Sequence, residues 1–335
     1  MEKTEKSKIW FAVVNVYAAS QTAAVLWKKA EYLLRQRGVP YHGILTGNAG
    51  TAVELTFDAC AAGYRRFIAV GGDGTVHDVL NGIANFVEWS TGSENECDFS
   101  DFTLTVIPFG SGNDWIKSLG IPRDVDRVVD VITAGVTAKQ DVVRVSMLDP
   151  DALPEEAELS VSYMANIGGV GLDAKVCERV NAKKIEGKRG KILFITSLIH
   201  AIRERKSIPM KVIADDKVIF DGPYYSMAFG IGKHSGGSMR QTPAAVLDDY
   251  LLDVTVIPEV PMRRLIPESR RLFSGTLLEV PEVVSAKCTK VVVLPSDLSA
   301  PQLVEVDGEL VGNAPVKLEV LKTQLNVIVH PNWKH

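Results

Sequence analysis

Short apolar segments alternate with amphipathic segments along the chain up to about residue 141. Residues 9–16 form an apolar, β-branched run, and residues 21–37 carry apolar side chains at helical spacing before a stop at Gly38 and Pro40. The same alternation predicts strands at 42–45, 67–70 and 103–107 and helices at 49–63, 75–86 and 113–119. Repeated strand–helix units predict a doubly wound α/β domain, with a parallel sheet covered by helices on both faces.

The rhythm changes after Asp141, where β-branched runs become short and are separated by turn residues. These runs lie at residues 159–165, 210–213, 217–220, 225–230, 252–257, 291–294, 303–306 and 316–321. The pattern predicts an antiparallel β-sandwich, interrupted by helical segments at 188–206 and 263–272. We therefore expect domains at 1–139 and 140–335, with about the last 10 residues returning to the first domain.

Composition and charge narrow the classes of protein that fit this pattern. The 335 residues are 46% hydrophobic and 23% charged, as in ordinary globular proteins, and the net charge of −4 gives no general attraction to nucleic acid. The four cysteines are far apart and lack the spacing of a zinc site or a disulfide framework. The N-terminus has no apolar signal core, and no apolar run reaches the roughly 18 residues of a spanning helix. We expect a cytoplasmic protein that neither crosses a membrane nor binds nucleic acid.

A glycine-rich loop follows the predicted strand at 67–70. It reads Gly-Gly-Asp-Gly-Thr over residues 71–75, and an amphipathic helix begins after it. Glycines let the backbone approach a phosphate, and the free N–H groups and dipole of a helix start favour negative charge. A tight turn alone needs fewer glycines. The sequence therefore predicts a phosphate-binding loop with Asp73 at its centre.

A second loop repeats this arrangement after the predicted strand at 103–107. It reads Pro-Phe-Gly-Ser-Gly-Asn-Asp over residues 108–114 and leads into a helix. Loops at the carboxyl ends of parallel strands face one crevice, the usual place of a ligand in an open α/β sheet. The GxxxxGK[ST] and GxGxxG patterns are absent, which argues against a P-loop enzyme and a dinucleotide-dependent dehydrogenase.

Five segments, taken in order, resemble one known family. They are residues 71–75, residues 108–114, Asn-Ile-Gly-Gly-Val-Gly-Leu-Asp at 166–173, the Gly-Gly-Ser-Met-Arg-Gln-Thr-Pro-Ala and Asp-Asp block within 236–254, and Val-Asp-Gly-Glu at 306–309. Together they resemble the diacylglycerol kinase catalytic-domain family, which includes sphingosine kinases and bacterial lipid kinases and is distantly related to NAD kinases. The resemblance covers about residues 9–329. It implies a nucleotide-binding α/β domain, a lipid-binding β-sandwich, and an active site in the cleft between them.

The resemblance also implies a set of site residues, with ATP and Mg²⁺ as cofactors. Asp307 is implied as the general base with Glu309 beside it, and Asp73 is implied as catalytic at the phosphate and metal end of the nucleotide. The residues implied in nucleotide binding are Asn15, Gly71, Gly72, Asp73, Gly74, Thr75, Gly110, Ser111, Gly112 and Asn113. Those implied in metal binding are Asp73, Asp114 and Asp141, through a water-mediated network, and Asp249 at a second, structural metal.

Two positions depart from the family's pattern. The family usually has Asn-Pro-x-Ser-Gly and often a basic residue near Asn15, where this chain reads Asn-Val-Tyr-Ala-Ala-Ser. A glycine normally follows the structural-metal aspartate, and here Tyr250 follows Asp249. The departures affect the nucleotide contacts of the first loop and the second metal site.

Taken without the resemblance, several of these residues have plain structural interpretations. Asp307 and Gly308 form a favoured hairpin turn between two predicted strands. Asp114 and Asp141 are loop aspartates of the kind that cap helices or form turns. Magnesium takes one or two carboxylates with phosphate oxygens and water, which also suits scattered loop aspartates. Both interpretations stay open at this point.

Residues 188–206 form the one strongly basic segment of the chain. Isoleucines at helical spacing give it an apolar face, and basic residues stand at both ends. This pattern is typical of a helix at a membrane interface, and equally of a helix that caps the sandwich with solvated ends.

These observations together predict a two-domain lipid kinase. It transfers the γ-phosphoryl group of ATP to a lipid hydroxyl, of the diacylglycerol or sphingoid type. Its partner is a lipid substrate at a membrane surface, reached by transient peripheral association, and a homodimer is compatible with the sequence. The rival interpretations are an NAD kinase-like enzyme, which shares the Gly-Gly-Asp-Gly-Thr loop, and a non-catalytic nucleotide or lipid sensor.

Overall fold

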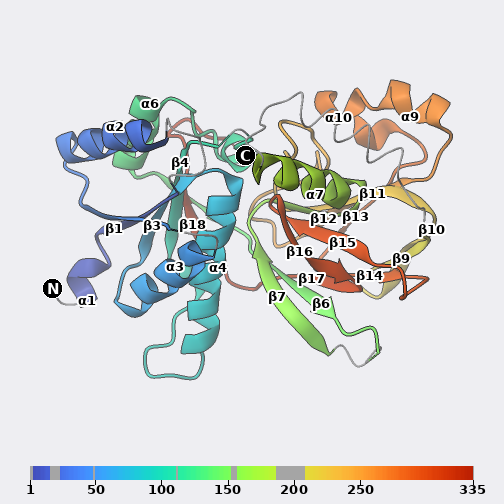
Figure 1. Ribbon diagram of the computed structural model, residues 1–335, viewed down its shortest axis with the longest axis horizontal. Helices are drawn as coiled ribbons and strands as arrows, with labels where there is room; N and C mark the ends of the chain where they lie inside the picture. Colours follow the sequence, from blue (N-terminus) through green and yellow to red (C-terminus); the bar gives the residue numbers. More distant parts are fainter. Residues whose placement is uncertain are drawn as a thin grey trace. The chain divides into compact units, whose positions relative to one another are not determined.

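Backbone contacts divide the chain into two units (Figure 1), Met1–Val142 with Lys322–His335, and Val143–Leu321. The boundary predicted from the sequence lies slightly earlier, after Lys139. The computed structural model describes residues 3–15, 23–47, 50–110, 112–151, 157–185 and 208–334. Ser111 of the second glycine loop and the basic segment 188–206 lie outside the described residues.

The first unit is built on a six-stranded sheet with the order β2-β1-β3-β4-β18-β5. Its strands are β1 (Trp10–Val14), β2 (Tyr41–Leu45), β3 (Arg66–Gly71), β4 (Thr103–Pro108), β5 (Thr137–Gln140) and β18 (Leu325–Ile328). All neighbours pair in parallel except β5, which runs antiparallel to β18 at one edge. Strands β1, β3 and β4 are buried along almost their whole length, as expected for strands covered on both faces.

The helices of the first unit follow from this strand order. They are α1 (Lys3–Lys6), α2 (Ala23–Gln36), α3 (Thr51–Ala61), α4 (Asp73–Ser90), η2 (Phe99–Asp101), α5 (Trp115–Leu119) and α6 (Val125–Ala134). Since β1 lies between β2 and β3, the crossovers carrying α2 and α3 run in opposite directions across the sheet. Right-handed crossovers then put α2 and α3 on opposite faces. In agreement, α2 packs with α6 and α3 with α4, on either side of the sheet in Figure 1.

The predicted elements of the first unit are present with small shifts at their ends, and the α/β prediction is confirmed. Two corrections concern the region around β5. The sheet is not wholly parallel, because β18 enters it from the C-terminal part of the chain and pairs with β5 in the opposite sense. Helix α6 was missed, although it starts at Asp124, whose side chain accepts a hydrogen bond from Arg127 N, and ends at Gly135 with a left-handed φ of 66°.

The second unit consists of two six-stranded sheets, β10-β9-β14-β17-β6-β7 and β13-β12-β11-β8-β15-β16. The first sheet contains β6 (Val143–Leu148), β7 (Glu158–Met164), β9 (Met210–Ala214), β10 (Lys217–Gly222), β14 (Lys290–Pro295) and β17 (Val316–Val320). The second contains β8 (Ile167–Gly171), β11 (Tyr224–Gly230), β12 (Leu252–Pro258), β13 (Val284–Cys288), β15 (Gln302–Val306) and β16 (Glu309–Ala314). Every assigned pair is antiparallel.

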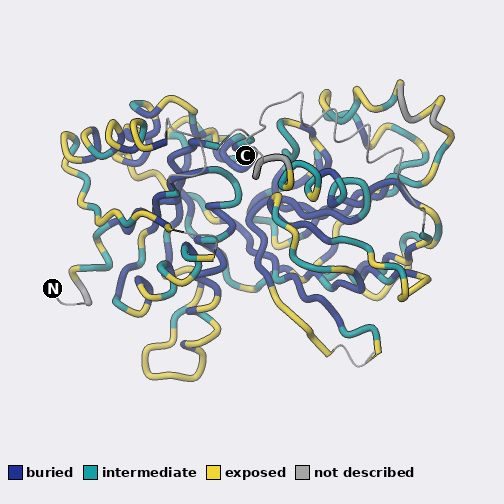
Figure 2. Tube along the Cα trace, viewed as in Figure 1, coloured by how far each residue is buried: buried dark blue, intermediate teal, exposed yellow. Residues whose placement is uncertain are grey.

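Apolar side chains from both of these sheets meet in one core. Val145 and Val212 come from the first sheet, and Met227 and Val254 come from the second; all four are buried in the same cluster. Figure 2 shows this burial running along the strands, while the first four residues of β7 are exposed. The predicted antiparallel β-sandwich is therefore confirmed.

The helices of the second unit differ most from the expectations. They are α7 (Leu172–Ile185), α9 (Met262–Glu268), α10 (Arg271–Ser274) and η3 (Leu277–Glu279). Helix α7 was not predicted, because its apolar residues do not form a clear stripe. The single helix expected at 263–272 is two short helices, because Pro267 at the end of α9 has no N–H to continue the ladder. None of the helices in the described ranges is long and apolar enough to span a bilayer.

Candidate active site

The strand order of the first unit reverses between β1 and β3, and ligands of α/β sheets bind at such a switch point, outside the carboxyl ends of the strands. Asn15 follows β1, and its N–H donates to Val70 O at 2.9 Å. Its side-chain Nδ2 donates to Thr75 Oγ1, 3.3 Å away in the first turn of α4. The structure thus brings the predicted nucleotide residues Asn15 and Thr75 together at this point.

The two glycine loops touch each other backbone to backbone. Phe109 N and Gly110 N both donate to Gly71 O, at 2.7 and 3.1 Å. A Cβ atom on Gly110 would lie 2.6 Å from Gly72 Cα, and one on Gly71 would lie 2.1 Å from Thr75 Oγ1. A side chain at Gly110 would therefore separate the two loops, and one at Gly71 would displace Thr75.

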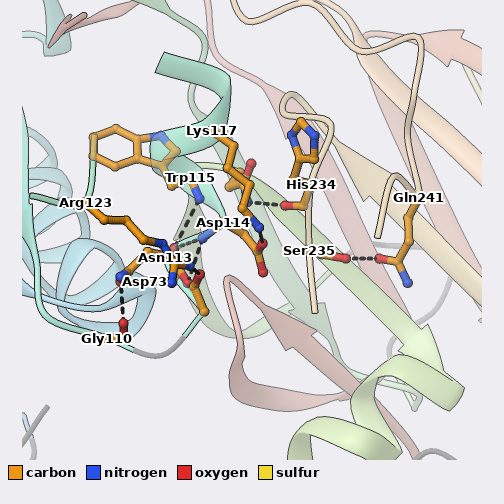
Figure 3. Close-up of polar contacts among 12 residues, drawn as sticks. Asp73, Gly110, Asn113, Asp114, Trp115, Lys117, Arg123, His234, Ser235 and Gln241 are labelled. Carbon is orange, nitrogen blue, oxygen red and sulfur yellow. Dashed lines mark hydrogen bonds and ion pairs between the residues drawn. The ribbon is translucent and has the colours of Figure 1, made fainter. Parts of the chain in front are cut away.

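Asp73 connects the two loops. It is the first residue of α4, and its Oδ1 accepts hydrogen bonds from Asp114 N at 2.9 Å and Trp115 N at 3.2 Å (Figure 3). Its Oδ2 also accepts from Asp114 N, at 3.1 Å. The carboxylate expected at the metal end of a nucleotide therefore also holds the start of α5.

The second loop leaves an unsatisfied acceptor and a small space. Asn113, with φ of 49° and only 3% of its surface exposed, donates from Nδ2 to Gly110 O at 2.6 Å. Its Oδ1 has no hydrogen-bond partner among the described residues. A Cβ on Gly112 would lie 3.1 Å from Asp73 Oδ2 and 3.7 Å from Asp114 Oδ2. A buried acceptor without a partner and a space bordered by two carboxylates are features that a bound ligand would complete.

Two of the predicted metal ligands, Asp73 and Asp114, border this space together. Lys117 Nζ forms an ion pair with Asp114 Oδ1. Within the described parts of the chain, no cluster of three or more His, Cys, Asp or Glu side chains could hold a metal by itself. Two carboxylates nevertheless fit Mg²⁺, which completes its shell with phosphate oxygens and water.

Asp141, the third predicted ligand of the network, is linked to the other two through its neighbours. Trp115 Nε1 donates to Gln140 Oε1 at 2.9 Å. Asp141 is fully buried, and its Oδ1 accepts from Gln324 Nε2 at 2.8 Å. Its carboxylate is therefore buried against the segment that leads into β18.

Asp307 lies in the second unit, at the tip of the β15–β16 hairpin, with φ of 54°. Its Oδ2 accepts from Ala165 N at 2.8 Å, and its Oδ1 accepts from Asn166 N at 2.9 Å and Ile167 N at 3.2 Å. These donors form the connection between β7 and β8. The predicted base is 8% exposed and fastens this connection to the hairpin.

Glu309, the predicted neighbour of Asp307, begins β16 and is half-buried. Gly308 between them has φ of 87°, so the two residues 307 and 308 form the left-handed turn that Asp-Gly favours. A further carboxyl group supports this turn from inside: Glu305 Oε2 accepts from Gly308 N at 2.9 Å, and Glu305 is only 6% exposed.

A polar cluster surrounds Asp173, in the first turn of α7. Asp173 Oδ2 accepts from Ser226 Oγ, and its Oδ1 accepts from Gln241 Nε2 at 2.6 Å. Gln241 in turn accepts from Ser235 Oγ (Figure 3). The Gly-Gly-Ser-Met-Arg-Gln segment singled out in the sequence is therefore tied to the start of α7.

Asp173 and Glu305 lie on either side of Gly169. A Cβ on Gly169 would lie 3.0 Å from Asp173 Cβ and 3.1 Å from Glu305 Oε1. Burial raises the pKa of Glu305 well above its ordinary value, and the neighbouring Asp173 carboxylate raises it further. Burial also raises the pKa of Asp173, against the hydrogen bonds from Ser226 and Gln241.

Asp249, the predicted ligand of a structural metal, lies in the turn before β12. Its Oδ1 accepts from Leu251 N at 3.1 Å, and its Oδ2 is 2.8 Å from Lys287 Nζ. The structure thus places a lysine ammonium, a positive charge of the chain itself, against the expected metal ligand.

Several residues that shape these surroundings were not anticipated. Signals for them did exist: Glu305 is a charged residue inside an apolar strand run, and Asp173 ends a segment used for the family resemblance. Asn166 belongs to that same segment. No sequence signal indicated Lys287, because its contacts are made across a sheet.

Comparison with known families gives two matches that follow one another along the chain. Residues 10–145 match the family model described as the diacylglycerol kinase catalytic domain. Residues 166–329 match the model described as the YegS C-terminal NAD kinase beta sandwich-like domain.

Individual known proteins that resemble this chain carry names that agree with these two family matches. The chain is 23% identical over 296 residues to the diacylglycerol kinase of Mycobacterium tuberculosis, with 88% of this chain and 86% of that protein covered. It is 27% identical over 259 residues to a Xanthomonas euvesicatoria protein named "Probable lipid kinase YegS-like", with 75% and 74% covered. It shares its fold with a crystal structure of a diacylglycerol kinase from Bacillus anthracis, at a TM-score of 0.72 and 22% identity over 97% and 98% of the chains.

The α/β unit with its paired glycine loops, together with the sandwich that follows it, defines a kinase that acts on the alcohol group of a lipid. The chain belongs to the diacylglycerol kinase catalytic-domain family.

Proposed function

We propose that this kinase transfers the γ-phosphoryl group of ATP to the free hydroxyl of a membrane lipid, with diacylglycerol as the first candidate and sphingoid bases as the second. The observation that carries the nucleotide part is the junction of the two glycine loops at the β1–β3 switch point. There Asp73 joins the loops, and Asn113 keeps a buried acceptor without a partner. The relatives named diacylglycerol kinase favour the substrate.

The two helix starts at this junction differ in a way that favours phosphate at one of them. The N–H groups of Asp114 and Trp115, at the start of α5, donate to Asp73. The 18-residue helix α4 begins after Gly72, which has no side chain to cap it. The dipole and N–H groups at the start of α4 are therefore suited to hold a phosphate.

Magnesium fits the space bordered by Asp73 and Asp114. These two carboxylates would hold the ion together with phosphate oxygens and water. When bound, Mg²⁺ would neutralise negative charge on the phosphoryl group being transferred. Lys117 is paired with Asp114 Oδ1, so Mg²⁺ bound here would share this carboxylate with an ammonium group.

On the lipid side, Asp307 is our proposed general base and Glu309 the second choice. A lipid alcohol is a weak nucleophile at neutral pH, so a carboxylate that accepts its proton accelerates transfer. The three backbone N–H groups that bind Asp307 fix its orientation, which supports a role that depends on position. Glu309 follows it across a two-residue turn and is more exposed.

Lipid substrates require contact with a bilayer. Residues 188–206 stay our predicted contact segment, since their basic ends and apolar face suit an anionic surface. Attachment by such a segment is reversible and weakens as salt increases.

The proposal is tested by phosphoryl transfer from γ-labelled ATP to a panel of lipids in mixed micelles. The panel contains diacylglycerol, sphingosine, ceramide and a polyprenol, with NAD as a control acceptor. We expect Mg²⁺-dependent labelling of diacylglycerol above the other acceptors. Labelling of NAD alone, or of no acceptor while ATP still binds, would refute the proposed function.

A matched pair of variants links the activity to the glycine loops. Asp73→Asn should reduce transfer by about 10²-fold or more, because it removes a charge aimed at the metal and phosphate end. Asp124→Asn is the control, since Asp124 also caps a helix of the same unit but lies at α6. Equal losses of activity and melting temperature in the two variants would show that Asp73 acts only as a cap.

A further inference from the structure

Lys287 lies on the edge strand β13, directly opposite Asp253 on β12. The register of the two strands pairs these residues, and Lys287 Nζ lies 3.3 Å from Asp253 Oδ2. The same nitrogen lies 2.8 Å from Asp249 Oδ2, in the turn that leads into β12. One ammonium group therefore bridges a carboxylate of the strand and a carboxylate of the turn.

The burial of these groups makes the bridge necessary. Asp253 is 6% exposed, and apart from the ion pair with Lys287 its Oδ2 makes no hydrogen bond with the residues that the structure describes. A buried carboxylate is strongly destabilising unless a positive charge or hydrogen bonds compensate it. A second carboxylate, Asp249, is within reach of the same cation, so without Lys287 the two would repel each other.

The turn keeps a left-handed residue after Asp249, where the family pattern has a glycine, although its sequence differs. Tyr250 adopts the left-handed conformation with φ of 58°, the conformation that glycine adopts at no steric cost. Asp249 Oδ1 is held by Leu251 N inside this turn. The backbone geometry is therefore retained with a tyrosine, while the outward oxygen Oδ2 faces Lys287.

With Lys287 in place, this turn has no open position for a metal ion. Magnesium and calcium bind oxygen ligands in a shell that water can complete, and in the described ranges the turn supplies the carboxylates of Asp249 and Asp253 without a third acidic, histidine or cysteine ligand. The oxygen that would face the ion is instead in contact with an ammonium group, which repels a divalent cation.

We propose that Lys287 replaces the structural metal ion of this turn: its ammonium group is a built-in cation that holds Asp249 and Asp253 together. The turn before β12 and its pairing with β13 are then independent of divalent metals.

The first experiment measures thermal unfolding of the nucleotide-free protein with EDTA and with millimolar Mg²⁺ or Ca²⁺. Mg²⁺ and Ca²⁺ should not change the melting temperature of the wild-type protein by binding at Asp249, because Lys287 already pairs with this carboxylate. Lys287→Met keeps the apolar stem and removes the charge, and it should lower the melting temperature by about 3–8 °C. Mg²⁺ or Ca²⁺ should restore part of this loss, and Asp249→Asn in the Lys287→Met background should abolish the restoration.

Lys290→Met is the matched control. Lys290 lies on β14 with 34% of its side chain exposed, against 36% for Lys287, but its partner Asp216 is 87% exposed. It should change the melting temperature by less than about 1–2 °C. If Lys287→Met behaves like this control, Lys287 does not hold the turn and the proposal is wrong.

Two further results would overturn the proposal. The first is a loss of stability in Lys287→Met that divalent cations do not restore, which would make the contact an ordinary ion pair. The second comes from calorimetric titration of the wild-type protein with Mg²⁺ or Ca²⁺. This experiment does not require a variant that folds without Lys287. Binding that disappears in Asp249→Asn would show that the site takes a metal after all.

Discussion

Asp307 and Asp215 are two aspartates with the same local geometry in different surroundings. Both lie in hairpin turns of the second unit with positive φ, 54° for Asp307 and 42° for Asp215. Both accept backbone N–H groups of another segment: Asp215 accepts from Thr289 N and Lys290 N, each at 3.0 Å. At the scale of one residue, each carboxylate binds the backbone of another segment in the same way. A catalytic role of Asp307 would therefore be additional to this structural role.

This equivalence gives a test of the proposed base. Asp307→Asn keeps the size and turn preference of the side chain but removes its basicity, so transfer should fall by about 10²-fold or more with ATP affinity retained. Asp215→Asn should leave transfer within a few-fold of wild type. Both variants should lower the melting temperature, since in each an amide NH₂ can face a backbone N–H. If Asp307→Asn loses stability but keeps its transfer rate, the Asp-Gly-Glu segment is only a hairpin.

At the scale of elements, the packing of α7 on β8 and β15 brings two carboxyl groups together. Asp173 comes from the first turn of α7, and Glu305 comes from β15, on either side of the side-chain-free Gly169. Neither strand nor helix alone would place these acids side by side. Burial and mutual repulsion raise the pKa of Glu305, so the fold favours its protonated form.

A pH dependence of stability follows from this pair. Because the pKa of Glu305 is raised in the folded state, its protonated form stabilises the fold at acidic pH. This contribution is lost as the pH rises from about 4.5 through the folded value. Glu305→Gln keeps an acceptor for Gly308 N and cannot ionise. Its unfolding free energy should therefore exceed that of wild type at pH 8, and the difference should shrink as the pH falls to 4.5.

Urea unfolding at several pH values measures this difference. Glu319→Gln, an exposed glutamate of β17, is the control and should show no such trend. A Glu305→Gln variant that is less stable than wild type at pH 8 would mean that the ionised carboxylate is needed to bind Gly308.

At the scale of the whole molecule, the chain closes its first unit with its last strand. Strand β18 lies between β4 and β5, and Leu325, Val327 and Ile328 are at most 1% exposed. Gln324, just before this strand, donates a hydrogen bond to Asp141. The first unit is therefore incomplete until the second unit has been synthesised.

Removal of residues 322–335 should consequently prevent stable folding of the first unit. Burial of three apolar side chains contributes about 5 kcal/mol or more, which is comparable with the whole stability of a typical domain. We expect loss of nucleotide binding and of a cooperative thermal transition of this unit. Removal of Lys334 and His335 alone is the control and should change neither. A shortened chain that binds ATP normally would show that β18 is dispensable.

The sequence predicted the elements whose local signals are strong. Strands β1, β3 and β4 are continuous apolar runs, and the glycine loops after β3 and β4 have distinctive compositions, so both were located with only small shifts. Helix α7 was missed because the segment is mostly polar and its few apolar residues do not form a distinct stripe. The antiparallel edge strand β5 was missed because the sense of pairing depends on β18, which is far away in the sequence.

By itself, the sequence determined that an α/β domain precedes an antiparallel β-sandwich, where the glycine loops lie, and which family the chain resembles. Each of these depends on neighbouring residues or on the order of motifs. Tertiary structure alone decided that Asp73 caps α5 and that Asp307 fastens the β7–β8 connection. It also decided that Asp173 meets Glu305 across Gly169, and that a lysine faces Asp249. These contacts join residues that are tens to more than a hundred positions apart. Their geometry follows from strand register and helix packing, which local residue patterns do not contain.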